Sequence, residues 1–109
     1  MFGGMKNMGD LMKLASQAGK IKENMAQAQE RARNRTAAAE SGAGMVKVSV
    51  NGLGEILSVQ IDAEALKDPE TLGPLITAAT NLALQKGKEI LMEETKTAMG
   101  GIDLPPGIM

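Results

Sequence analysis

The chain has 109 residues, an apolar content of 43% and a net charge of −1. It has no cysteine and no histidine, which excludes disulfides, thiolate metal sites, cysteine nucleophiles and imidazole bases. The length predicts one domain. Phe2 is the only aromatic residue, so the core must be aliphatic. Such a core is thin for this length, which favours burial against a second copy.

The charges are unevenly distributed along the chain. Residues 1–35 carry seven basic residues and three acids, a net charge of +4, whereas the remainder carries five and ten, a net charge of −5. This asymmetry suggests an end that faces a polyanion. Charge alone leaves open the alternative that these side chains are simply solvated on a long helix.

The first predicted element is a long helix over residues 5–35, which contain good helix formers and no proline. Its apolar residues recur at alternating steps of three and four, as in a coiled-coil seam. They are Leu11, Leu14, Ala18, Ile21, Met25, Ala28 and Ala32. The pattern predicts packing along another long helix, in this chain or in a partner.

The pattern of residues 36–61 predicts a three-stranded antiparallel meander. Apolar and polar residues alternate over 46–50 and 57–61, as in half-buried strands. The Asn51-Gly52-Leu53-Gly54 stretch is typical of a tight hairpin connection, and residues 41–44 form a second turn of this kind. A weaker first strand precedes that turn.

A short helix is predicted over 62–67, with Asp62 as its N-cap, and a long helix over 69–99. Asp68 is the expected N-cap of the long helix, with Pro69 at its first position. An extended tail over 101–109, which contains Pro105-Pro106 and several apolar residues, is expected to dock on another surface.

The segment SGAGMVKVSVNGLGEILSVQID, the helix start at Asp68-Pro69-Glu70 and the LPPG stretch at 104–107 resemble the YbaB/EbfC family of bacterial nucleoid-associated proteins. The resemblance covers essentially the whole chain. It implies an α+β fold: a two-layer α-β-β-β-α subunit, paired through its sheets in a homodimer whose long helices project like tweezer arms. It also implies a protein of the nucleoid that binds duplex DNA with little sequence specificity and organises the nucleoid or modulates gene expression. The cytoplasm is the expected compartment, because the sequence shows no signal-peptide pattern and no apolar run long enough to span a membrane.

The predicted DNA-binding residues are the basic positions of the first helix, which would contact phosphates without any need for aromatic side chains. They are Lys13, Lys20, Lys22, Arg31, Arg33 and Arg35. The three arginines are the first choice because they form the densest positive charge in the chain. The alternative is that they pair with acids of the second half.

The predicted dimer interface consists of the apolar rows of two strands. These residues are Val46, Val48, Val50, Leu57, Val59 and Ile61. The sequence does not decide which face of the sheet forms this interface. We expect no catalytic residue, metal, cofactor, small-molecule substrate or membrane partner. The acid pair Glu93-Glu94 lies on a predicted helix surface with no nucleophile or base beside it, so the protein is not expected to be an enzyme.

A second function stays open at this stage. The methionine-bearing first helix and the apolar tail are compatible with a peptide-binding or protein–protein adaptor, which requires an exposed apolar patch.

Overall fold

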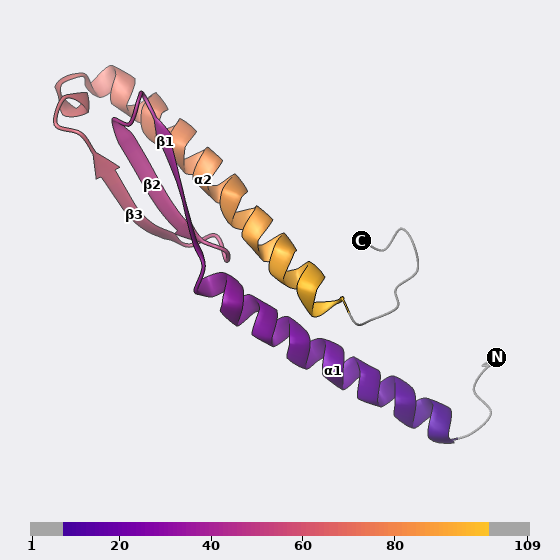
Figure 1. Ribbon diagram of the computed structural model, residues 1–109. Coiled ribbons are helices and arrows are strands. Elements are labelled where there is room, and N and C mark those ends of the chain that lie inside the picture. The colour runs from indigo at the N-terminus through magenta and orange to yellow at the C-terminus, as the bar shows by residue number, and fades with distance from the viewer. Residues whose placement is uncertain (1–7, 101–109) are drawn as a thin grey trace.

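A helix, three strands and a second helix follow one another in the computed structural model, which describes residues 8–100 (Figure 1). The elements are α1 (Met8–Arg33), β1 (Thr36–Ser41), β2 (Val46–Asn51), β3 (Ile56–Ile61), the 3₁₀ turn η1 (Ala65–Lys67) and α2 (Pro69–Ala98). This order confirms the predicted α-β-β-β-α subunit. The predicted tail over 101–109 lies outside the described residues.

The sheet is an antiparallel meander in the order β1-β2-β3. The β1–β2 turn needs left-handed backbone at Gly42, Ala43 and Gly44, which glycine adopts at little cost. The β2–β3 turn is organised by Asn51, whose side-chain oxygen accepts hydrogen bonds from the amides of Leu53 and Glu55 at 3.0 and 3.1 Å. Both predicted turns are therefore present.

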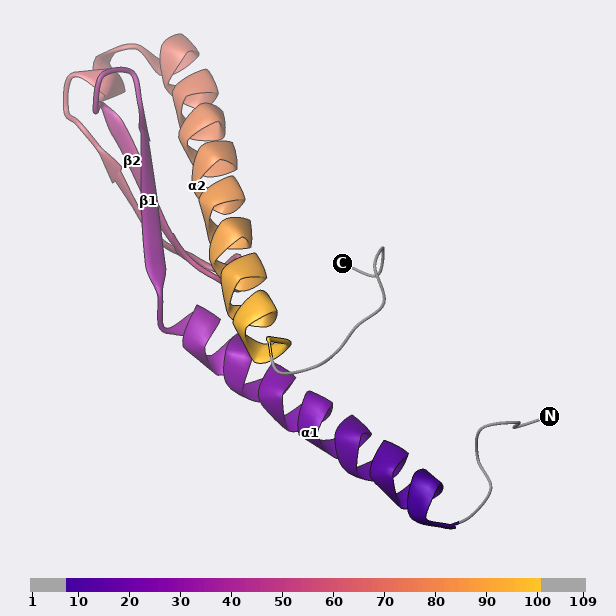
Figure 2. The same ribbon diagram turned by 45° about the vertical axis from the view of Figure 1, so that its right-hand side comes forward.

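Helix α2 lies along one face of the sheet, over β1 and β2 (Figures 1 and 2). Alternation along β2 turns Val46, Val48 and Val50 toward this helix, and all three are 0% exposed. Ala79 and Ala83 of α2 are equally buried against them. The small alanine side chains let the helix approach the sheet closely, so one helix and two strands enclose the core.

The start of α2 agrees with the sequence prediction. Asp68 is the N-cap, and its carboxylate accepts hydrogen bonds from the amide and the hydroxyl of Thr71. These bonds hold the pKa of Asp68 below its ordinary value. The short helix before it is shorter than predicted. It covers only Ala65–Lys67, and Asp62 accepts a bond from the amide of Glu64 instead of capping the helix.

The end of α1 packs against the end of α2. Ala28 and Ala32 of α1 are fully buried there, beside Ile90 and Ala98 of α2. The rest of α1 continues beyond the body of the subunit (Figure 2), and with this helix included the chain measures 72 × 24 × 17 Å. The seam predicted along the whole of α1 is therefore covered by α2 only over its last turns.

Candidate nucleic-acid interface

The projecting part of α1 carries Lys13, Lys20 and Lys22, and all three side chains are exposed. No acid occurs in the sequence between Leu11 and Lys22. Within the part of the chain that the structure describes, none of the three lysines pairs with a carboxylate. This stretch therefore presents positive charge that the described structure does not neutralise.

The three lysines do not share one face of α1. Lys13 and Lys20 are seven residues apart, which places them on the same side of the helix and about 10 Å apart along its axis. Lys22 points to nearly the opposite side, about 160° around the axis from Lys20. One phosphate backbone can therefore contact both Lys13 and Lys20, while Lys22 is placed to contact a second backbone on the other side of the helix.

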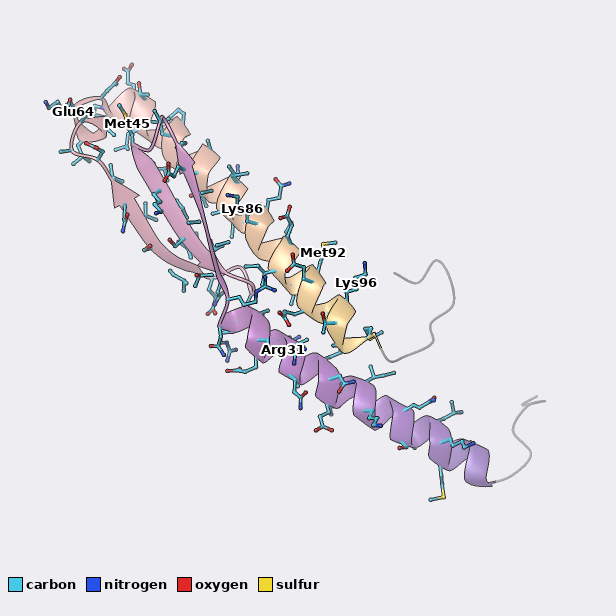
Figure 3. The ribbon with its side chains drawn as sticks, viewed as in Figure 1. Arg31, Met45, Glu64, Lys86, Met92 and Lys96 are labelled. Carbon is cyan, nitrogen blue, oxygen red and sulfur yellow. The ribbon has the colours of Figure 1, made fainter. Side chains whose placement is uncertain are left out.

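Arg31 and Arg35 lie at the junction of α1, β1 and α2, where both pair with Glu94. Arg31 Nε lies 2.7 Å from Glu94 Oε1, and Arg35 Nη1 lies 2.9 Å from Glu94 Oε2. Arg35 Nη2 also lies 2.9 Å from Glu93 Oε2. Figure 3 labels Arg31 at this junction. Arg31 and Arg35 therefore pair with acids of the second half of the chain, as in the alternative considered from the sequence.

Arg33 is placed differently from the other two arginines. Its guanidinium lies 3.2 Å from the carboxylate of Glu30, one turn back on the same helix, and both side chains are more than half exposed. Exposed pairs of this kind contribute little to stability. Arg33 is therefore free to exchange its partner for another anion.

Glu94 is the centre of the junction. Its side chain is only 13% exposed, and it accepts hydrogen bonds from two guanidinium groups. The bonds from Arg31 and Arg35 lower the pKa of Glu94 below its ordinary value of 4.5, and the bonds to Glu93 and Glu94 raise the pKa of Arg35. No local pattern in the sequence marks this role of Glu94, because the pairing joins residues about sixty positions apart.

Two further hydrogen bonds hold α1 in this position. The amide of Gly52 donates to the carbonyl of Ala32 at 2.8 Å, and the side-chain amide of Asn24 donates to the carbonyl of Ala98 at 3.3 Å. Together with the ion pairs, they set the direction in which α1 leaves the body of the subunit.

The pairing at Glu94 predicts a specific dependence of stability on pH. A carboxylate whose pKa is lower in the folded than in the unfolded state stabilises the fold above its unfolded pKa, and this contribution is lost as pH falls through the folded pKa. Glu94→Gln is expected to lower the melting temperature at pH 7, and the difference from wild type is expected to shrink below about pH 4.5. Differential scanning calorimetry from pH 3 to 7 measures both effects.

Glu89→Gln, which removes an exposed carboxylate from the same helix, is the control. A Glu94→Gln protein with the melting temperature of wild type at neutral pH would show that the ion pairs do not stabilise the junction.

The residues of the predicted dimer interface fall into two groups. The β2 residues Val46, Val48 and Val50 are buried under α2 of the same chain. The prediction that they form the dimer interface is therefore wrong, because they belong to the core of one subunit. Leu57 and Val59 of β3 are 52% and 44% exposed, and Ile61 is half-buried. The sequence prediction omitted Ile56, which is 49% exposed on the same strand.

The comparisons with known proteins agree with this architecture. Residues 5–102 match the YbaB/EbfC DNA-binding family. The chain belongs to the YbaB/EbfC family. It is a DNA-binding family rather than a family of enzymes, as the sequence analysis expected.

Relatives from several bacteria carry the name nucleoid-associated protein. The YbaB/EbfC protein described here is 41% identical to one from Chlorobium phaeobacteroides, over 97% of this chain and 93% of the relative. It is 37% identical to one from Maricaulis maris, over 93% of this chain and 96% of the relative. The crystal structure of an uncharacterized Helicobacter pylori protein superposes with a TM-score of 0.62 at 32% identity, covering 70% of this chain and 90% of that one.

Two other kinds of site find no support in the described part of this YbaB/EbfC protein. Over residues 8–100, no helix is both long enough and apolar enough to cross a bilayer. The same part of the chain contains no cluster of three or more acidic side chains arranged to hold a metal ion.

Proposed function

We propose that this protein binds duplex DNA in the nucleoid through phosphate contacts from α1, with little preference for sequence, and thereby organises DNA or modulates expression. The observation that carries the proposal is the three exposed lysines, Lys13, Lys20 and Lys22, on a helix that projects from the subunit. Membership of a DNA-binding family and the names of the relatives support it.

The lysines, rather than the arginines, are the principal contacts in this proposal. Lys13, Lys20 and Lys22 need to break no ion pair within the described structure in order to meet a phosphate. Arg31 and Arg35 would have to leave Glu94, which is largely buried. Arg33 can join the lysines, because its own pair is exposed.

The mechanism is counterion release. Each lysine that neutralises a phosphate frees a cation condensed on the duplex, so affinity falls steeply as salt rises. Phosphates carry no sequence information by themselves, so such contacts position the protein without reading bases. A single arm offers few contacts, and tight binding would require the arms of two copies.

We propose that the second copy joins along β3. This strand lies at the edge of the sheet, α2 does not cover it, and it carries no charged residue from Ile56 to Ile61. Soluble monomers usually protect such edges with charges or prolines, because the free amides and carbonyls of an edge pair readily with another chain. A homodimer formed here would bury the exposed side chains of Ile56, Leu57 and Val59.

Replacing Lys13, Lys20 and Lys22 together by alanine tests the DNA-binding proposal. The slope of log K against log salt is expected to flatten by about 0.9 for each phosphate of duplex DNA that a lysine no longer neutralises. The melting temperature is expected to stay near that of wild type, because these side chains are exposed. Fluorescence anisotropy with unrelated labelled duplexes, measured over a series of salt concentrations, gives the slopes.

A control variant with Lys47, Lys67 and Lys88 changed to alanine removes the same charge from other exposed positions. It separates a local effect on binding from a general decrease in positive charge. Equal salt slopes for the two triple variants would contradict the assignment of the site to α1.

The adaptor function requires exposed apolar surface, and two such surfaces exist, on β3 and on the projecting part of α1. The first is assigned above to a second copy of the chain. DNA binding is the function supported best, because the chain belongs to a DNA-binding family.

A further inference from the structure

The turn between β2 and β3 contains Asn51-Gly52, the only Asn-Gly pair of the chain. In such a pair the amide nitrogen of glycine can attack the side-chain carbonyl carbon of asparagine, because no Cβ hinders its approach. Both residues are buried here, and Asn51 is only 2% exposed. The turn therefore combines a reactive sequence with a protected position beside the end of α1 (Figures 1 and 2).

The fold requires each member of this pair. The side-chain oxygen of Asn51 accepts hydrogen bonds from the amides of Leu53 and Glu55, and its Nδ2 donates to Glu55 Oε1 at 2.7 Å. A Cβ at Gly52 would lie 2.7 Å from both the carbonyl oxygen of Ala32 and Ile90 Cγ2. The turn therefore needs asparagine at the first position, and the close approach of both helices needs glycine at the second.

The same contacts keep the pair from reacting. The amide of Gly52 donates to the carbonyl of Ala32 at 2.8 Å, and the attack requires this amide to lose its proton. The three hydrogen bonds of the Asn51 side chain also hold its carbonyl carbon in place. Both sets of bonds must be released before the nitrogen can reach the carbon.

The end of α1 controls this release. Ala32 lies between Arg31 and Arg35 in the sequence, and both arginines pair with Glu94. Local opening at the end of an element requires less free energy than global unfolding. We propose that Asn51 is a site of deamidation whose reactivity is controlled by the packing of α1, and that it reacts when the end of this helix leaves the turn.

The reaction needs only water and hydroxide. In the opened turn, hydroxide removes the proton of the Gly52 amide, and the nitrogen forms a bond to Asn51 Cγ. The bond from Cγ to Nδ2 breaks, and the leaving nitrogen takes up a proton and departs as ammonia. Water then adds to one of the two carbonyl carbons of the cyclic imide and breaks its bond to the ring nitrogen. The product is aspartate or isoaspartate at position 51.

Neither product restores the original contacts. In aspartate an oxygen replaces Nδ2, which lies 2.7 Å from Glu55 Oε1, so two carboxylates would face each other. In isoaspartate the main chain gains a methylene group, which changes the geometry of the turn. The end of α1 therefore loses part of its support, and the change is irreversible.

The wild-type protein provides the first test. The full chain is incubated in mildly alkaline buffer, either folded or unfolded in guanidinium chloride, and the tryptic peptide 48–67, in which Asn51 is the only asparagine, is followed by mass spectrometry. Deamidation is expected to be at least about tenfold slower in the folded protein. Equal rates would show that the fold does not protect the pair and would overturn the proposal.

Two variants test whether α1 controls the reaction. Glu94→Gln weakens the pairing with both arginines and is expected to speed the deamidation of Asn51 at least about threefold under native conditions. Leu72→Ala is the control, because Leu72 packs on the core in the first turn of α2, at the opposite end of this helix. Urea denaturation measures the global stability of both variants.

If the reaction required global unfolding, the rates would follow these global stabilities. An unchanged rate in Glu94→Gln, or an equal or larger acceleration in Leu72→Ala, would therefore overturn the control by α1. None of these experiments uses DNA, so their outcome is independent of the DNA-binding proposal.

Asn51→Asp tests the effect of the product. The amides of residues 30–33 are expected to exchange hydrogen at least about threefold faster than in wild type. Adding Glu55→Gln is expected to restore slow exchange, because the glutamine amide can donate to the new carboxylate. Wild-type exchange in Asn51→Asp would contradict the proposed loosening of α1.

Discussion

Replacing Gly87 by alanine is expected to lower the free energy of unfolding by about 2 kcal/mol, although alanine is the better helix former. A Cβ at this position would lie 2.8 Å from the carbonyl oxygen of Asn51 and 3.2 Å from Val50 Cγ2. The nearer atom belongs to the backbone of β2 and cannot rotate away. Helix α2 would have to move off the sheet, which loosens the core around Val50.

Gly73 provides the matched control, because it lies in the same helix with nothing within 4 Å of an added Cβ. Gly73→Ala is expected to change the free energy of unfolding by less than about 1 kcal/mol, because the helix preference of alanine is opposed by the crowding of a Cβ before Pro74. Urea denaturation followed by far-UV circular dichroism, at one protein concentration, measures both. Shifts of the same sign and size would refute the close approach at Gly87.

Val59→Asp is expected to convert the proposed homodimer into monomers, with a dissociation constant at least about a thousandfold higher than that of wild type. Val59 is 44% exposed on the edge strand β3. Burying a valine contributes about 1.5–3 kcal/mol, and an unpaired carboxylate in its place adds a desolvation penalty. The change occurs twice in a symmetric dimer, and each 1.4 kcal/mol is a factor of about ten.

Sedimentation equilibrium over a range of concentrations measures this effect. Met92→Asp is the control, because Met92 is 69% exposed on α2, and Figure 3 shows it on the body of the subunit away from β3. Circular dichroism verifies that the monomer of Val59→Asp is folded. A wild-type protein that is monomeric at micromolar concentration, or a Val59→Asp variant that dimerises like wild type, would remove β3 as the interface.

The elements of this protein could be predicted from sequence because their signals are local. Alternation of valines identifies β2, Asn51 and Gly52 identify the hairpin, and Asp68 with Pro69 identifies the start of α2. Each of these signals depends on backbone preferences of neighbouring residues. The least accurate prediction was the short helix after β3, where Asp62 forms a local turn before η1.

The candidate site was predictable only as a set of basic residues. Sequence showed that Lys13, Lys20, Arg31 and Arg35 belong to one helix or to its end. It did not show which of them have partners, since pairing with Glu94 requires α1 and α2 to lie antiparallel. The packing of Ala28 and Ala32 on α2 decides that arrangement, and it makes two arginines structural while leaving the lysines open.

Sequence by itself determined the order of helices and strands and the positive charge of α1, because periodicity and charge are properties of neighbouring residues. Only the tertiary structure decided which apolar strand is core and which is surface, since β2 and β3 have similar patterns. A helix is about 10 Å across and strands are spaced about 4.8 Å apart, so α2 covers two strands and no more. With α2 over β1 and β2, the apolar side chains of β3 stay exposed.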